Sequence, residues 1–181
     1  AEAGEAVTLP MPELPVTSDR ETAPTVTVDL PSNAAAQVEI PVKDVTPGTV
    51  AALVKPDGTE EVIKTSVTTE TGVAVTLSDG DTVKIVDNSK DFADVSEDYW
   101  GADAVAFATS RELFTGTSAA TFSPDAATTR AMIVTVLARL EDVDTTDGST
   151  WYEAGQQWAM EHGISAGTNM EGYLTRAQLA A

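Results

Sequence analysis

Apolar and polar side chains alternate with a period of two through residues 25–87, where valine is the commonest apolar residue. This period is the pattern of a half-buried strand, because successive side chains of a strand point to opposite faces. Turn sequences separate the runs: TPG at 46–48, PDG at 56–58 and SDGD at 78–81. The pattern predicts a small antiparallel β-sandwich, immunoglobulin-like in layout, over residues 25–88. The predicted strands are TVTVDL, QVEIPV, TVAALV, EVIKTSV, GVAVTL and DTVKIV.

The segment before these strands is rich in proline. Residues 1–24 hold four of the nine prolines of the chain. Proline removes a backbone donor and favours extended geometry in the residue before it. We therefore expect residues 1–24 to form an extended arm or linker.

Composition excludes several classes of partner. The chain has 10 basic and 29 acidic residues, a formal net charge of -19, so a nucleic-acid partner is not expected. No cysteine is present, which excludes disulfides, cysteine-ligated zinc and a cysteine nucleophile. No run approaches the roughly 20 apolar residues of a membrane span, so membrane insertion is not expected.

The apolar period changes to that of a helix after residue 92. Trp100, Ala104, Phe107 and Ala108 fall on one helical face. Met132, Ile133, Val136, Leu137 and Leu140 make a second such face. The helical period therefore predicts an all-α region over residues 89–181, in which loops join the helices. The fold class expected for the whole chain is α+β in separate domains.

The helical half contains an internal repeat with an offset of 51 residues. Trp100 matches Trp151, and Gly116 matches Gly167. After a loop that is five residues shorter in the second copy, the sequence Thr-Arg-Ala recurs. We place repeat one at 92–140 and a partial repeat two at 149–181. Since the second copy stops at QLAA, we expect either a longer protein or a partner that packs over that end.

These residues resemble the S-layer homology repeat of bacterial surface proteins. The resemblance rests on FADV at 92–95, LFTG at 113–116, FSP at 122–124 and TRA at 129–131, with TRA again at 175–177. The β segment resembles a module that precedes such repeats in exported proteins of anaerobic Gram-positive bacteria. The resemblance implies an S-layer homology helical bundle, incomplete in this chain.

The resemblance also implies a function. Such repeats attach proteins non-covalently to the cell wall, because grooves between them bind secondary cell-wall polysaccharide that often carries acidic pyruvate ketals. The expected protein is secreted, lies at the cell surface and is not an enzyme. No cofactor or metal is expected.

Six residues are the candidate glycan contacts. The arginine of Thr-Arg-Ala lies in or beside the groove in the family, which points to Arg130 and Arg176. Trp100 and Trp151 either stack on sugars or belong to the core. Gly116 and Gly167 permit a tight turn, and the resemblance adds a close approach of ligand to backbone.

The arginines also have a purely structural interpretation. An arginine in the first turn of a helix presents its donors beside free backbone N–H groups, an arrangement that favours a carboxylate. In Arg130 and Arg176 that carboxylate belongs either to a ligand or to a local acid of the chain. The acids considered are Asp94, Asp98 and Asp125.

Thr-Arg-Ala is also a helix start. Thr129 and Thr175 are predicted N-caps, and Gln178 completes a capping box with Thr175. The family has glutamate at the position of Gln178 and of Met132. The Met132 side chain cannot accept a hydrogen bond from the backbone N–H of the N-cap residue, and Met132 is expected to pack in the core.

The sequence offers little for catalysis. The single histidine, His162, is expected at a helix end. Asp142, Asp144 and Glu153 have partial calcium-loop spacing, but Gly148 comes one position late, so this segment is expected to be a linker. The alternative function is a structural or protein–protein interaction module, in which the degenerate repeats only pack or self-associate through the incomplete C-terminal repeat.

Overall fold

The chain divides into two compact units, residues 1–112 and residues 113–181. The computed structural model describes residues 6–31 and 34–179. Each unit has its own core. Within the described residues no helix is both long enough and apolar enough to cross a membrane.

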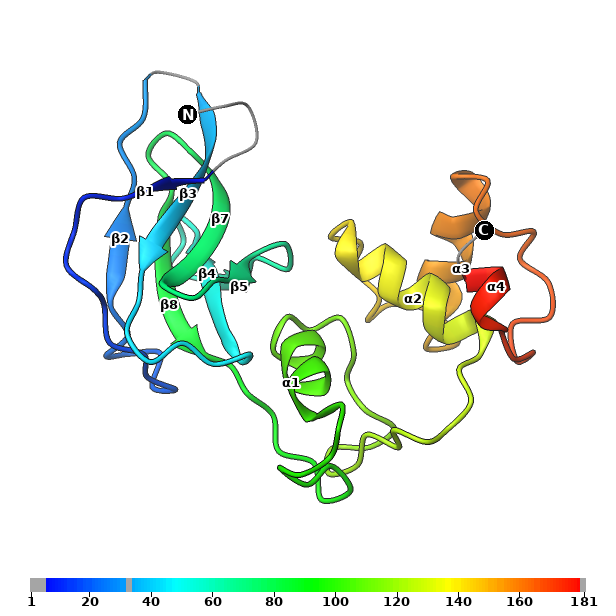
Figure 1. Ribbon diagram of the computed structural model, residues 1–181. Helices are drawn as coiled ribbons and strands as arrows, with labels where there is room; N and C mark the ends of the chain where they lie inside the picture. The colour runs from blue at the N-terminus through cyan, green and yellow to red at the C-terminus, as the bar shows by residue number, and fades with distance from the viewer. Residues whose placement is uncertain (1–5, 32–33, 180–181) are drawn as a thin grey trace. The chain divides into compact units, whose positions relative to one another are not determined.

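Unit 1 contains two four-stranded sheets (Figure 1). One sheet has the order β1-β3-β7-β6 and the other the order β2-β8-β4-β5. The strands are β1 (Val7–Thr8), β2 (Thr25–Thr27), β3 (Ala35–Pro41), β4 (Thr49–Val54), β5 (Glu60–Val62), β6 (Val67–Thr68), β7 (Gly72–Ser78) and β8 (Thr82–Asp87). Alternate side chains of both sheets form one core, including Val38, Ile40, Val75, Val83 and Ile85.

The positions of the predicted strands are confirmed, but their arrangement differs from the prediction. The run EVIKTSV forms two short strands, β5 and β6, which lie in different sheets. β1 pairs with β3 in parallel, so the β unit is not purely antiparallel. Its two sheets with a shared core match a sandwich only loosely.

The proline-rich segment lies against the β core. Leu9, Met11, Leu14 and Val16 pack on the core as partly buried residues. The backbone of Leu14 forms a parallel bridge with Val42. Prolines between these residues keep the segment extended while its apolar side chains contact the sheet.

The first helix, α1 (Ala102–Ser110), belongs to unit 1 and contacts β4. Its buried residues are Val105, Thr109 and Ser110. The predicted face was wrong: Trp100 lies before the helix and is 89% exposed. The side of the helix that meets the β unit carries small and polar residues, so apolar periodicity did not identify it.

Unit 2 contains α2 (Arg130–Leu140), α3 (Glu153–Glu161) and the single turn α4 (Arg176–Leu179). α2 and α3 pack through a small core of Ala131, Val134, Ala159 and Met170. The predicted apolar face of α2 was also wrong, since the buried residues are Ala131, Val134, Thr135 and Ala138. These are small side chains, which allow α3 to approach closely.

The predicted all-α bundle was wrong. Of the helices in the described residues, α1 is buried against the β unit and α4 has only four residues. The α2–α3 pair that remains is too small to enclose a helical core. The chain is mainly β in unit 1, with a few short helices.

The predicted helix caps are confirmed. Thr129 Oγ1 accepts a hydrogen bond from Met132 N at 3.3 Å. Thr175 and Gln178 form the reciprocal capping box, with Gln178 N donating to Thr175 Oγ1 at 3.2 Å and Thr175 N donating to Gln178 Oε1 at 3.1 Å. α1 and α3 each have nine residues and start 51 positions apart. Gly116 and Gly167 have similar positive φ angles, 78° and 70°.

Candidate functional site

A cavity of about 490 Å³ lies within unit 2. This volume falls in the range of about 300–1,000 Å³ that is usual for ligand pockets. Aromatic and aliphatic side chains make most of the wall, and hydroxyl groups and one arginine supply the polar part. The lining residues are Phe114, Thr115, Gly116, Thr117, Phe122, Ser123, Pro124, Ala126, Thr128, Met132, Thr135, Val136, Arg139 and Trp151.

One stripe of α2 forms a wall of the cavity. Met132, Thr135, Val136 and Arg139 are spaced by three, one and three residues, which places them on one helical face. The neighbouring stripe of small residues packs on α3. Met132 therefore lines the cavity, at the position where the family has glutamate, and this wall carries no acid.

The loop between Phe114 and Thr128 forms the opposite wall. It is held by hydrogen bonds within itself, including Thr117 N to Thr121 O at 2.9 Å and Thr117 Oγ1 with Ser123 Oγ at 2.7 Å. The Phe114 and Phe122 rings lie 6.1 Å apart. Gly116 turns the chain with a φ of 78°, a conformation that favours glycine.

Arg139 is the one charged side chain that lines the cavity. Its Nε donates to Thr145 Oγ1 at 2.9 Å, and its Nη1 donates to Leu113 O at 3.1 Å. Within the described residues Nη2 makes no hydrogen bond and the guanidinium makes no ion pair. Burial lowers the pKa of Arg139, because desolvation disfavours the charged form. An anionic group in the cavity would compensate this desolvated charge.

Thr135 adds a second unsatisfied polar group. Its side chain is 2% exposed, and its Oγ1 has no hydrogen-bond partner within the described residues. A buried hydroxyl without a partner costs free energy, commonly about 1–3 kcal/mol. Thr135 is among the lining residues, but its buried Oγ1 lies on the side of α2 that faces Gly155 of α3.

Trp151 contributes an aromatic surface at the edge of the cavity. Its side chain is 53% exposed, and its ring packs edge-on against Tyr152 with centroids 5.2 Å apart. A partly exposed indole face can stack on the apolar face of a sugar ring. Trp151 precedes α3, so the cavity is built from both copies of the repeat.

The structure brings two of the six predicted residues together. Gly116 and Trp151 both line the cavity. Arg130, Arg176 and Gly167 belong to unit 2 but are not among its lining residues. Trp100 belongs to unit 1 and is not part of the core, since it is 89% exposed.

Of the two Thr-Arg-Ala arginines, Arg130 contacts another part of unit 2 through its backbone. Arg130 N donates to Gly172 O at 3.0 Å, which joins the start of α2 to the loop between α3 and α4. Neither arginine makes an ion pair within the described residues, so the predicted pairing with a local acid is not seen there. Arg176 is exposed.

Sequence reasoning missed Arg139, Thr135 and the role of Met132. Their spacing on α2 is visible in the sequence, and Arg139 is the only basic residue of that stripe. The signal was obscured because the stripe mixes apolar, hydroxyl and charged residues. His162 lies at the end of α3 as predicted, and its Nδ1 contacts Trp158 O at 2.8 Å.

The acidic segment before α3 is not arranged as a metal site. Asp144 Oδ1 accepts from Thr146, and a Glu153 carboxylate oxygen accepts from Ser149 Oγ at 2.7 Å. These bonds lower the pKa of both carboxyls. No group of three or more potential metal-ligating side chains occurs in the part of the chain that the structure describes.

Comparison with known proteins finds a family match for one region of the chain. Residues 91–131 match the S-layer homology domain family. No curated protein and no solved structure matches the chain significantly. Domains of this family are generally cell-wall anchoring modules that bind secondary cell-wall polymer. Residues 91–131, which run from the segment before α1 to the start of α2, are thus similar to an S-layer homology domain.

Proposed function

We propose that this chain is part of a secreted, non-catalytic surface protein that binds secondary cell-wall polysaccharide through the cavity of unit 2. The observation that carries the proposal is the composition of that cavity. It combines aromatic walls and hydroxyl groups with a single guanidinium that has no acid partner in the part of the chain that the structure describes. Aromatic faces and hydroxyls suit a sugar, and the guanidinium suits an acidic substituent.

Arg139 is the proposed anchor of the acidic group, which we take to be the carboxylate of a pyruvate ketal. Trp151 and the Phe114–Phe122 pair are the proposed stacking surfaces. Gly116 keeps the loop backbone close to the cavity. Since the two Thr-Arg-Ala arginines lie outside the lining, their proposed contribution is limited to ligand segments that extend beyond the cavity.

Sedimentation with cell-wall sacculi tests this function. The chain is mixed with sacculi that carry pyruvylated polysaccharide, and with the same sacculi after the polysaccharide has been extracted. We expect the chain to pellet only with the first preparation. Equal pelleting with both preparations would show that peptidoglycan or non-specific contact causes the binding.

A second candidate function is protein–protein interaction, including self-association. It is favoured by large apolar side chains that unit 2 leaves exposed. These are Met160, Ile164, Tyr173 and Leu179, with exposed fractions of 52%, 51%, 69% and 56%. Light scattering distinguishes the two candidates, because a chain that ignores sacculi but is dimeric in solution supports the second.

A further inference from the structure

Arg111, the residue that directly follows α1, is completely buried. Its relative exposure is 0%, which is rare for a charged side chain. No ion pair compensates it within the described residues. Burial lowers the pKa of Arg111 to about 10, because the guanidinium is desolvated. Such a residue needs several hydrogen-bond acceptors around it.

Backbone carbonyls of the β unit supply most of those acceptors. Arg111 Nε donates to Ser66 O at 2.7 Å, Nη1 donates to Pro47 O at 3.0 Å, and Nη2 donates to Thr49 O at 3.3 Å. The three carbonyls come from the segment that enters β4 and the residue before β6. Every guanidinium nitrogen thus reaches a different carbonyl of the β unit.

The same guanidinium also contacts its own helix. Nη1 donates to Phe107 O at 3.1 Å and to Ser110 Oγ at 3.2 Å, and the guanidinium carbon lies 3.6 Å from the centre of the Phe107 ring. Arg111 therefore joins the C-terminal end of α1 to the β unit. Since α1 ends one residue earlier, these contacts also satisfy carbonyl groups of its last turn.

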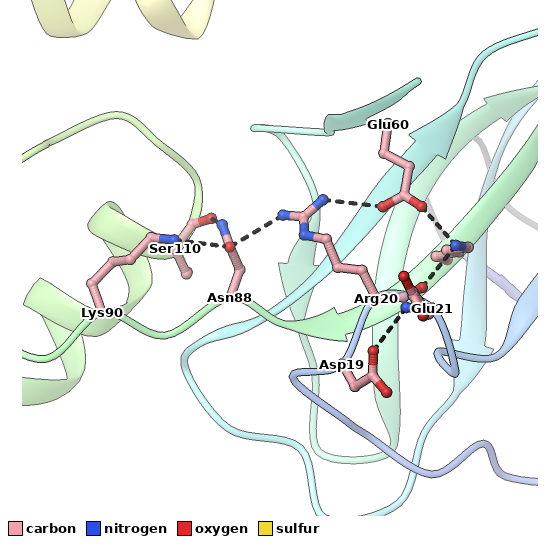
Figure 2. Close-up of polar contacts among 8 residues, drawn as sticks. Asp19, Arg20, Glu21, Glu60, Asn88, Lys90 and Ser110 are labelled. Atoms are coloured by element: carbon pink, nitrogen blue, oxygen red, sulfur yellow. Dashed lines mark hydrogen bonds and ion pairs between the residues drawn. The ribbon is translucent and has the colours of Figure 1, made fainter. Parts of the chain in front are cut away.

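A second connection runs through Asn88, at the end of β8. Figure 2 shows its side chain between Arg20 and the helix, with the amide nitrogen donating to Ser110 O. Arg20 also pairs with Glu60, which accepts in addition from Lys84 Nζ at 2.6 Å. The network extends from the proline-rich segment across the sheet to the end of α1.

α1 has little stability of its own. It has nine residues and no side-chain N-cap. Isolated helices shorter than about 12–15 residues are marginal in water. Val105 is its only buried aliphatic residue larger than alanine. Its persistence therefore depends on the contacts at its C-terminal end.

We propose that the contacts of Arg111 act as a clasp that holds α1 on the β unit. α1 then detaches from the β unit and returns to it in a step that is separate from unfolding of the β core. The clasp lies at the boundary of unit 1, which ends at residue 112, inside the region similar to an S-layer homology domain. The first helix of that region therefore packs on the β unit. The carbonyl site near β4 is an internal docking site for an arginine-bearing helix.

Hydrogen exchange of the full chain, read by mass spectrometry, tests the clasp without any ligand. In Arg111→Ala we expect peptides that cover α1 to exchange at least tenfold faster, while peptides of β3 and β7 keep the parent rates. Arg111→Lys should give an intermediate increase, since an ammonium keeps the charge but cannot reach three carbonyls at once. Arg130→Ala, which removes an arginine of unit 2, is the matched control and should leave α1 unchanged.

Two results would overturn the proposal. One is unchanged exchange of α1 in Arg111→Ala. The other is equal acceleration of α1 and the β core, which would make Arg111 a general stability residue with no separate opening step. If the alanine variant does not fold, the same comparison in Arg111→Lys decides between these outcomes. The result is independent of the proposed glycan binding, because the assay contains no polysaccharide.

Discussion

Arg139→Ala is expected to weaken binding to pyruvylated cell-wall polysaccharide by about 10- to 100-fold. A hydrogen bond to a charged group contributes about 1.5–3 kcal/mol, and each 1.4 kcal/mol corresponds to about a factor of ten in affinity. Among the described residues, Arg139 is the only cation that lines the cavity, and its Nη2 makes no hydrogen bond to them. The measurement is a binding isotherm with sacculi or soluble polysaccharide, at constant salt.

The controls for this prediction distinguish the loss of a ligand contact from a loss of folding stability. Arg139 also bonds Leu113 O and Thr145 Oγ1, so thermal melting of each variant must accompany the isotherm. Arg139→Lys keeps the charge and should retain part of the affinity. Arg130→Ala and Arg176→Ala are matched controls with expected losses below about threefold. Normal binding by Arg139→Ala, combined with a loss in either control, contradicts the proposed site.

Gly155→Val is expected to destabilise unit 2 by about 2 kcal/mol or more, which corresponds to a fall in melting temperature of roughly 10 °C. A Cβ at Gly155 would lie 2.8 Å from Thr135 Cα and 3.0 Å from Thr135 N. These are backbone atoms of α2 and cannot yield as a flexible side chain does. The two helices must separate, and the α2 wall of the cavity moves with them.

Calorimetry of the full chain measures this effect. The transition of unit 1 serves as an internal reference, because Gly155 lies in unit 2. Gln157→Ala changes the exposed face of the same helix and should shift the melting temperature by little. An unchanged transition of unit 2 in Gly155→Val would mean that α2 and α3 do not cross closely at this residue.

The sequence predicted local structure better than packing. Alternation located the strands, and the offset of 51 residues anticipated that α1 and α3 have equal lengths. Thr129 and Thr175 cap their helices as expected, since capping depends only on nearby residues. The partner of each helix was not predictable in the same way. Arg111 docks α1 on carbonyls of the β unit, and backbone carbonyls carry no sequence signal.

Helix faces were mispredicted for a related reason. In α2 the apolar face was expected to consist of Met132, Ile133, Val136, Leu137 and Leu140. The close approach at Gly155 selects small residues instead, so Ala131 and Ala138 are buried completely. Apolar periodicity measures hydrophobicity, whereas this contact depends on size.

The candidate site was predicted in part. Gly116 and Trp151 were named from the repeat, and both line the cavity. The family motif pointed to Arg130, which is not among the residues that line this cavity. Arg139 follows at the other end of α2, where the helix, the loop from Phe114 and Trp151 converge. That convergence depends on tertiary structure and is not contained in any motif.

Fluorine NMR of the full chain labelled with 5-fluorotryptophan tests the central claim most directly. The chain has three tryptophans, and Trp151→Phe assigns the resonance of Trp151. On titration with purified pyruvylated wall polysaccharide, we expect a saturable shift of the Trp151 resonance that is absent in Arg139→Ala, while the Trp100 resonance stays unchanged. A chain that pellets with polysaccharide-bearing sacculi while Trp151 does not respond, or while Trp100 alone responds, would contradict binding in the unit 2 cavity.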